Sequence, residues 1–194
     1  MFEQHWGPEK EEFSDRDPDT LVGWPENYPF IADCHSILDI GCGIGNVVEW
    51  LNKCGHEAYG VTCQQSEQEH AYKLKRPVYR CDMHDLSWGY YLGSEKLSHT
   101  SRFDAFTMWD SLEHSIAPLA ALMEAKRVTR NGGKGMIFIP GQNWVDYFTH
   151  IIVPTQAQMK HLLKQAGLKL VEIVDVSWGG TAPEQAVYKV EVVK

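Results

Sequence analysis

The feature that most constrains the fold is a cluster of glycines between a short apolar segment and a helix. Residues 36–40 read Ser-Ile-Leu-Asp-Ile, and Gly-Cys-Gly-Ile-Gly follows at residues 41–45. The apolar segment is typical of a buried strand, and residues 46–54 carry apolar side chains at helical spacing. Glycine permits a turn with positive φ and lets a ligand approach the backbone, because it has no Cβ. The pattern therefore predicts a strand–loop–helix unit that binds a ligand at the loop.

Strand and helix patterns alternate along the rest of the chain. The expected strands cover residues 36–40, 57–61, 77–81, 103–109, 135–139, 168–174 and 186–193. The expected helices cover residues 46–54, 64–73, 115–129 and 155–166. Strands separated by helices form a parallel sheet with helices on both faces, whereas the last two strands are joined by a loop. The sequence thus predicts a doubly wound, Rossmann-like α/β fold with a seven-stranded sheet, mostly parallel with an antiparallel last strand.

The N-terminal segment differs from the rest of the chain. Residues 1–30 are rich in Asp, Glu and Pro with scattered aromatic residues, and we expect a cap of short helix and loop there. Residues 31–194 are expected to form the ligand-binding domain. Trp6, Trp24 and Tyr28 are candidates for a lid over the site or for plain core. Residues 88–101 are polar and contain glycine, which predicts a loop or a weak helix.

Composition excludes several classes of function. The formal net charge is −8, which disfavours binding to nucleic acid or to an anionic membrane. The five cysteines include no C-x-x-C pair, so we expect reduced thiols in a cytoplasmic protein. No apolar run approaches the roughly 20 residues of a membrane span. No H-E-x-x-H motif or other tight His/Glu spacing is present, and no metal site is predicted from the sequence.

An acidic residue distinguishes this loop from a dinucleotide-binding loop. A pyrophosphate normally binds G-x-G-x-x-G, whereas here the spacing is G-x-G-x-G and Asp39 precedes it, which suits a cationic group. Residues 39–45 resemble the first motif of class I S-adenosylmethionine-dependent methyltransferases. Residues 81–86, 103–114, 128–133 and 150–167 resemble later segments of that family in the same order. The resemblance extends over about residues 36–175, most of the chain.

The resemblance implies that S-adenosylmethionine is the cofactor and S-adenosylhomocysteine the product. It places the glycine loop around the methionine part, Asp39 near the amino group, and Asp82 and Met83 at the adenine. The family usually has an acidic residue at the ribose, but Thr62 stands there, so Thr62, Gln64 or Glu67 is expected to make this contact. The predicted cofactor-binding residues are Asp39, Gly41, Cys42, Gly43, Gly45, Thr62, Cys63, Gln64, Asp82, Met83 and Trp109.

The methyl acceptor is expected beside the cofactor, beyond the carboxyl ends of the strands. Asp110 and His114 follow the fourth expected strand and His150 follows the fifth, which makes them the candidate catalytic residues. A histidine would serve as general base if the acceptor must lose a proton. No N/D-P-P-Y/F segment, which enzymes methylating exocyclic amines of bases or glutamine amides carry, follows the fourth strand. This favours a small organic acceptor over nucleic acid.

The predicted function is therefore methyl transfer to a small organic molecule by in-line displacement, by a monomer or homodimer. Two other functions stay open. One is a catalytically inactive relative that binds the cofactor and acts as a scaffold or subunit. The other is an NAD-dependent oxidoreductase, which the loop spacing and the missing ribose carboxylate disfavour.

Overall fold

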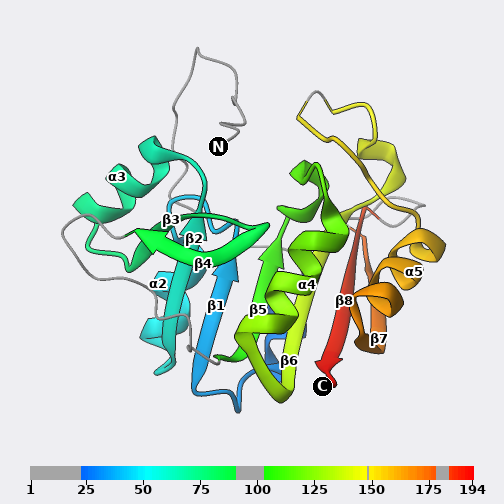
Figure 1. Cartoon of the computed structure of the whole chain (residues 1–194), viewed down its shortest axis with the longest axis horizontal. Helices are drawn as coiled ribbons and strands as arrows, with labels where there is room; N and C mark the ends of the chain where they lie inside the picture. The colour runs from blue at the N-terminus through cyan, green and yellow to red at the C-terminus, as the bar shows by residue number, and fades with distance from the viewer. Residues whose placement is uncertain (1–22, 91–102, 148, 178–183) are drawn as a thin grey trace.

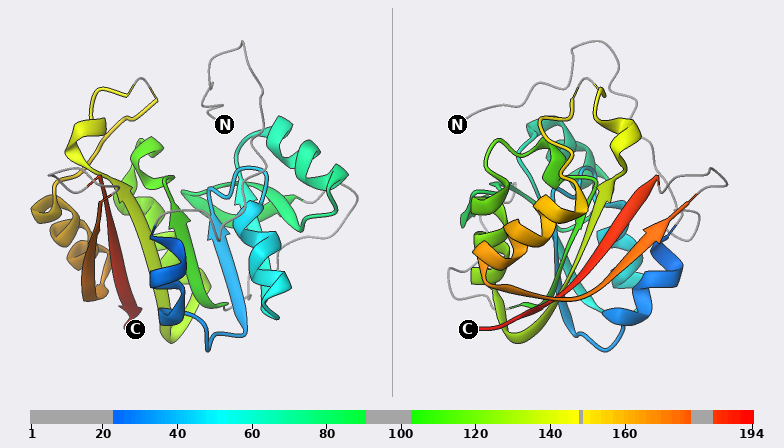
Figure 2. Two further views of the ribbon diagram at one scale, coloured as in Figure 1. Left: turned by 180° about the vertical axis from the view of Figure 1, so that it is seen from behind. Right: turned by 90° about the vertical axis from the view of Figure 1, so that its right-hand side faces the viewer.

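The computed structural model describes residues 23–90, 103–147, 149–177 and 184–194, and these form one sheet with helices on both faces (Figures 1 and 2). The strands lie in the order β4-β3-β2-β1-β5-β6-β8-β7. Their bounds are β1 Ser36–Ile40, β2 Glu57–Thr62, β3 Val78–Asp82, β4 Asp85–Tyr90, β5 Phe103–Trp109, β6 Thr129–Pro140, β7 Leu168–Val176 and β8 Gln185–Val192. The α-helices are α1 Trp24–Asn27, α2 Asn46–Lys53, α3 Gln65–Lys73, α4 Pro118–Val128 and α5 Gln156–Ala166. The described residues also form three 3-10 helices: η2 Tyr28–Phe30, η3 Leu112–His114 and η4 Gln142–Trp144.

The sheet is parallel at its centre and antiparallel at both edges. Strands β3, β2, β1, β5 and β6 pair in parallel, while β8 runs antiparallel to β6 and β7. This confirms the doubly wound fold and the antiparallel last strand. The predicted total of seven strands is wrong, because β4 pairs antiparallel with β3 as an eighth. Its sequence, Asp-Leu-Ser-Trp-Gly-Tyr, alternates polar or small residues with apolar ones, which is the pattern of a half-buried strand. The expectation of a loop or weak helix from residue 88 is therefore wrong for residues 88–90. Residues 91–102 lie outside the described residues.

Two apolar cores lie on opposite faces of the sheet. Helices α1, α2 and α3 cover one face, and α4 and α5 cover the other (Figure 2). Side chains alternate along β1: Ile37 packs into the core with α1 and α2, whereas Leu38 and Ile40 pack into the core with α4 and α5. Asp39 therefore points to the α2 face at the carboxyl end of β1.

The aromatic residues of α1 belong to the core. Trp24 is fully buried, and its ring lies 5.3 Å from that of Trp109 and 5.7 Å from that of Trp50. Trp24 is thus core and not a lid, while Trp6 lies outside the described residues. No helix among the described parts of the chain is both long and apolar enough for a membrane span.

Local details differ from the expected element ends at two points. The sequence favours Asn46 as the N-cap of this helix, since asparagine is a preferred residue there. In the structure Gly45 is the N-cap, with φ +79°, and Asn46 is the first helical residue, its side chain accepting a hydrogen bond from Arg76. The Asn131-Gly132-Gly133 turn lies within β6, where the register with β5 shifts between the Phe103–Thr129 and Ala105–Lys134 pairs. The register shift shows that the turn bulges out of the ladder instead of preceding the strand.

Candidate functional site

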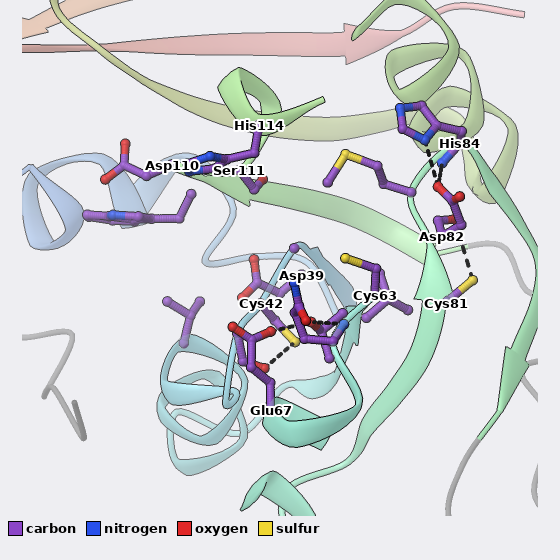
Figure 3. A pocket seen from close by; sticks show the side chains of 18 of the residues that line it. Asp39, Cys42, Cys63, Glu67, Cys81, Asp82, His84, Asp110, Ser111 and His114 are labelled. Carbon is purple, nitrogen blue, oxygen red and sulfur yellow. Dashed lines mark hydrogen bonds and ion pairs between the residues drawn. The ribbon is translucent and has the colours of Figure 1, made fainter. Parts of the chain in front are cut away.

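A cavity of about 370 Å³ opens at the carboxyl ends of β1, β2, β3 and β5 (Figure 3). This is the edge at which ligands bind in doubly wound sheets, and its volume lies within the usual range of small-molecule sites. The residues that line it are Asp39, Gly41, Cys42, Gly43, Asn46, Val47, Val61, Thr62, Cys63, Gln64, Glu67, Cys81, Asp82, Met83, His84, Trp109, Asp110, Ser111, His114 and Ile116. No lysine or arginine is among these described lining residues.

The glycine loop forms one wall and leaves room for a ligand. Gly43 has φ +54°, and a Cβ built there would meet its nearest described atom, Glu67 Oε1, only at 3.9 Å, so its Cα faces open cavity. Gly41 has φ +77°, and a Cβ there would lie 2.4 Å from Ser111 Cβ. Ser111 in turn donates to the carbonyl of Ile40 at 2.8 Å, which fixes the end of β5 against the end of β1. The loop is held close to β5 on one side and is open to the cavity on the other.

Two carboxyl groups, one buried and one half-buried, line the same cavity. Asp39 is 2% exposed and accepts a hydrogen bond from Thr107 Oγ1 at 2.6 Å, across the β1–β5 pair. Burial raises the pKa of Asp39 to about 7, although the Thr107 hydroxyl partly offsets this. Glu67, in the first turn of α3, accepts from the Thr62 hydroxyl, and burial raises its pKa as well. Both carboxyl groups accept hydrogen bonds from neutral hydroxyls, and no lysine or arginine lines the cavity beside them. This arrangement suits a cationic or hydroxyl-bearing ligand.

Asp82, at the end of β3, is held by His84. Its Oδ1 accepts from the backbone N–H of His84 at 2.9 Å and lies 2.6 Å from His84 Nδ1. The other ring nitrogen of His84 lies 2.7 Å from Ser115 Oγ. A histidine in the polar segment after a strand is expected in a turn at the surface, but His84 lines the cavity and fixes the orientation of the Asp82 carboxylate.

The opposite wall comes from the segment after β5, as Figure 3 shows for Asp110, Ser111 and His114. Asp110 has φ +42°, which a non-glycine residue rarely adopts, and its Oδ1 accepts from Gln185 Nε2 at 2.7 Å. Trp109 stacks on Phe138 with ring centroids 4.0 Å apart. The pKa of His114 is lowered by burial, so its imidazole is neutral near pH 7. This wall combines an aromatic surface with two groups that can accept a proton.

The structure gathers most of the predicted site residues around this single cavity. Every predicted cofactor-binding residue except Gly45 lines it, as do Asp110 and His114 among the candidate catalytic residues. Gly45 is instead the N-cap residue of α2. A Cβ at this position would lie 2.7 Å from Val78 Cγ2, so the tight packing against β3 requires glycine here. His150 does not line the cavity but lies behind His114, with ring centroids 5.0 Å apart. The roles of these residues in binding stay predictions.

Three site residues were missed or only weakly signalled by the sequence. Ser111 and His84 act through contacts between distant segments, which no local pattern reveals. Glu113 is fully buried beside His114 and His150, although a glutamate in a short polar stretch normally lies at the surface. The buried position follows from the packing of the segment after η4 over η3.

The family model and the similar solved structures all point to methyltransferases. The model of the family described as "Methyltransferase domain" matches residues 6–173. An S-adenosylmethionine-dependent methyltransferase from Clostridium acetobutylicum superposes with a TM-score of 0.69 at 14% identity, covering 88% of this chain and 89% of that one. The 1,6-didemethyltoxoflavin-N1-methyltransferase of Burkholderia thailandensis, solved with 1,6-didemethyltoxoflavin and S-adenosylhomocysteine, gives 0.66 at 17% identity, covering 88% and 77%. A structure of the Haloferax volcanii Trm112 methyltransferase activator in complex with a methyltransferase gives 0.70 at 12% identity, covering 88% and 90%.

Proposed function

The chain belongs to the methyltransferase-domain family of S-adenosylmethionine-dependent enzymes, and we propose that it methylates a small organic acceptor by in-line displacement. The observation that carries the proposal is the pair of carboxyls, buried Asp39 and half-buried Glu67, on a glycine-lined cavity that has an aromatic wall opposite. When bound, the cofactor supplies a methyl group on a sulfonium and leaves as the neutral thioether S-adenosylhomocysteine. The chain's own residues bind, orient and shield the reactants.

The donor set of the cavity fits this cofactor. The carboxylate of Asp39 is placed to attract the cationic amino group of the methionine part, and the open face of Gly43 admits that part close to the backbone. We assign Asp82 to the adenine amino group, with His84 fixing the carboxylate, and Met83 to the ring beside it. Asp82 Oδ1 already accepts a hydrogen bond from the backbone N–H of His84. We therefore assign the hydrogen bond from the adenine amino group to the other carboxylate oxygen, Oδ2.

Glu67 replaces the acidic residue that is missing at the end of β2. The Thr62 hydroxyl donates to Glu67, so the carboxylate of α3 lies beside the end of β2, which supports this assignment. A buried carboxylate that accepts from hydroxyls can take two further hydrogen bonds from a ribose. We therefore assign the ribose contact to Glu67, with Thr62 as its positioning residue.

The acceptor is assigned to the wall formed by Trp109, Asp110, His114 and Ile116. Methyl transfer requires an acceptor lone pair held behind the methyl carbon and away from water, so positioning supplies much of the rate. Where the acceptor carries a proton, the neutral imidazole of His114 can accept it. Trp109 offers a flat apolar surface, which suits an organic ring or chain more than a polymer backbone.

Calorimetric titration with S-adenosylmethionine, S-adenosylhomocysteine and NAD tests the cofactor assignment. We expect saturable binding of the first two and none of NAD, and we expect Glu67→Gln to weaken both by about tenfold or more, because it removes a charged acceptor. Glu69→Gln is the matched control: Glu69 lies in the same helix but is bonded to Gln65 at the surface. Equal affinities for both variants would contradict the assignment of Glu67.

Turnover separates an enzyme from an inactive scaffold. A panel of small hydroxyl-, amine- and carbon-nucleophile acceptors is incubated with S-adenosylmethionine, and S-adenosylhomocysteine release is measured. Acceptor-dependent release supports methyl transfer. Tight cofactor binding without release by any acceptor would favour a scaffold or subunit, and binding of NAD alone would overturn the proposal.

A further inference from the structure

Three side chains behind the acceptor wall bring metal-ligating atoms together. Glu113 and His114 lie in η3, and His150 lies in the segment after η4. One ligating atom from each lies within 4.8 Å of the other two. The two segments are joined by hydrogen bonds from the backbone N–H groups of Ile151 and Ile152 to the carbonyl of Glu113, at 2.9 and 3.1 Å. The cluster is therefore a fixed part of the fold.

Glu113 is the unusual member of the cluster. Its side chain is 0% exposed, and neither carboxyl oxygen has a hydrogen-bond partner among the described residues. Buried carboxyl groups are normally hydrogen-bonded or paired, because an isolated one loses its hydration without compensation. A carboxyl group in this position is stabilised either by keeping its proton or by a cation that the fold holds next to it.

The two imidazoles favour the cation. His114 Nδ1 lies 2.8 Å from the carbonyl of Thr149, and His150 Nδ1 lies 2.8 Å from the carbonyl of Trp144. Because a carbonyl only accepts, Nδ1 of each ring carries the hydrogen, and Nε2 of a neutral ring carries a lone pair. These Nε2 atoms lie 3.7 and 4.0 Å from Glu113 Oε1. Two imidazole nitrogens that carry lone pairs thus lie close to one carboxylate oxygen, and the ligating atoms of the three side chains lie within 4.8 Å of one another.

We propose that Glu113, His114 and His150 bind a divalent transition-metal ion of the Zn²⁺ type. Imidazole and carboxylate are the donors that such ions prefer, and backbone carbonyls that hold the far ring nitrogens are typical of metal-binding histidines. Ligand atoms about 2.1 Å from a tetrahedral ion are roughly 3.4 Å apart. The two separations from Glu113 Oε1, 3.7 and 4.0 Å, are close to this value, and because the ligating atoms span up to 4.8 Å the side chains must move closer together to bind the ion. The site goes beyond the proposed function and does not depend on it.

The position of the site gives the ion access to the acceptor wall. Three protein ligands leave a coordination position for an outside oxygen, as in catalytic zinc sites. His114 also lines the cavity, so the ion would lie at its wall. With the ion bound, His114 is a ligand and no longer the general base.

Metal titration of the full chain tests the site directly. Protein stripped with a chelator is titrated with Zn²⁺ against a chromophoric competitor, and we expect one equivalent to bind saturably. Glu113→Gln and His150→Gln should each weaken binding by about 100-fold or more, since loss of an outer-shell partner alone costs 10–100-fold. His161→Gln, an exposed histidine of α5, is the matched control and should bind as the wild type does.

Two further measurements, the spectrum of bound Co²⁺ and the affinity for S-adenosylhomocysteine, test the site even if one variant folds poorly. Co²⁺ bound to the wild type should show visible d–d bands without the near-ultraviolet charge-transfer band of a cysteine thiolate. S-adenosylhomocysteine affinity, measured on the same samples, should be unchanged in His150→Gln, which separates failure of the metal site from failure of the cofactor site. Absence of saturable Zn²⁺ binding, undiminished binding in both cluster variants, or a thiolate spectrum would overturn the proposal.

Discussion

At the scale of single residues, the site is organised by carboxyl groups that the fold buries and that the surrounding chain does not neutralise. Asp39 illustrates the principle. Burial raises its pKa to about 7, and the one hydroxyl hydrogen bond from Thr107 only partly offsets this. No lysine or arginine lines the cavity to compensate for the burial. A ligand's cationic amino group would supply the missing charge and favour the ionised form.

Cofactor affinity should therefore depend on pH through Asp39. A raised pKa means that the carboxyl is protonated below about pH 7 and must lose its proton to pair with the cation. Affinity for S-adenosylhomocysteine should rise with pH from 5.5 to 7.5, by up to about tenfold per unit at the acid end, where one proton is released on binding. Calorimetry in buffers of different ionisation enthalpy measures both the affinity and the number of protons released on binding.

Variants of Asp39 and of its hydrogen-bond donor Thr107 provide the controls. Asp39→Asn should bind more weakly and lose the pH dependence. Thr107→Val removes the hydrogen bond that favours the charged carboxylate, so the rise should move to higher pH. A wild-type affinity that stays flat over this range would contradict the pairing of Asp39 with the amino group.

At the scale of elements, two glycines of the loop need positive φ for different reasons: Gly41 packs tightly against a neighbouring residue, and Gly43 leaves the cavity open. Gly41 and Gly43 both have left-handed backbone, but only at Gly41 would a Cβ collide with a neighbour, Ser111. Gly43→Ala should cost about 1–2 kcal/mol of unfolding free energy from backbone strain and should also weaken cofactor binding, because its Cβ enters the cavity. Gly41→Ala should cost more, because Ser111 must move as well.

Gly55 is the matched control for this series. It has φ +94° and no atom within 4 Å of a built Cβ, so Gly55→Ala carries the strain without the contact. Urea unfolding measures stability, and titration measures affinity. Equal loss of cofactor affinity in Gly55→Ala and Gly43→Ala would show that the loop acts through global stability alone.

Arg76 fixes the start of α2 next to the loop. This 5%-exposed guanidinium donates to Glu49 Oε2 at 2.7 Å, to Asn46 Oδ1 at 2.8 Å and to the carbonyl of Ile44 at 3.2 Å. Arg76→Lys cannot reproduce the fork and should cost about 2–3 kcal/mol in urea unfolding, with weaker cofactor binding. Arg80→Lys is the control: the hydrogen bond from Arg80 to Gln65 lies at the surface, so this substitution should change stability by less than about 0.5 kcal/mol. Similar losses in the two variants would contradict this role for Arg76.

The elements also show which parts of the structure the sequence could predict. The unit from β1 through the loop to α2 follows from local chemistry, since apolar periodicity and glycines act within a few residues. Strand β4 has a local signal as well, an alternation of polar or small and apolar residues, but it is only six residues long and contains a glycine, so the polar segment that follows it obscured the pattern. The meeting of Glu113 with His150 is equally hidden, because the contact spans 37 residues of sequence and arises only when the segment after η4 packs over η3.

At the scale of the whole molecule, ligand binding should be visible as stability. A ligand that binds only the folded chain stabilises it by RT ln(1 + [L]/Kd), about 2.7 kcal/mol at one hundred times Kd. In a chain of this size that corresponds to a rise in Tm of roughly 5–10 °C. S-adenosylhomocysteine should produce this shift and NAD should not, because the cavity presents carboxyls where a pyrophosphate would need N–H donors.

Zn²⁺ and S-adenosylhomocysteine, added together, test whether the two sites are independent. The cofactor assignment uses the wall formed by β1, β2 and β3, whereas the metal cluster lies behind the β5 wall. Sites without shared partners give additive free energies, so the two shifts in unfolding free energy should sum within about 0.5 kcal/mol. In Glu67→Gln only the S-adenosylhomocysteine shift should shrink, and in His150→Gln only the Zn²⁺ shift. A shift that disappears in both variants would mean that the two ligands share one site, and the division of the cavity into a cofactor wall and an acceptor wall would be wrong.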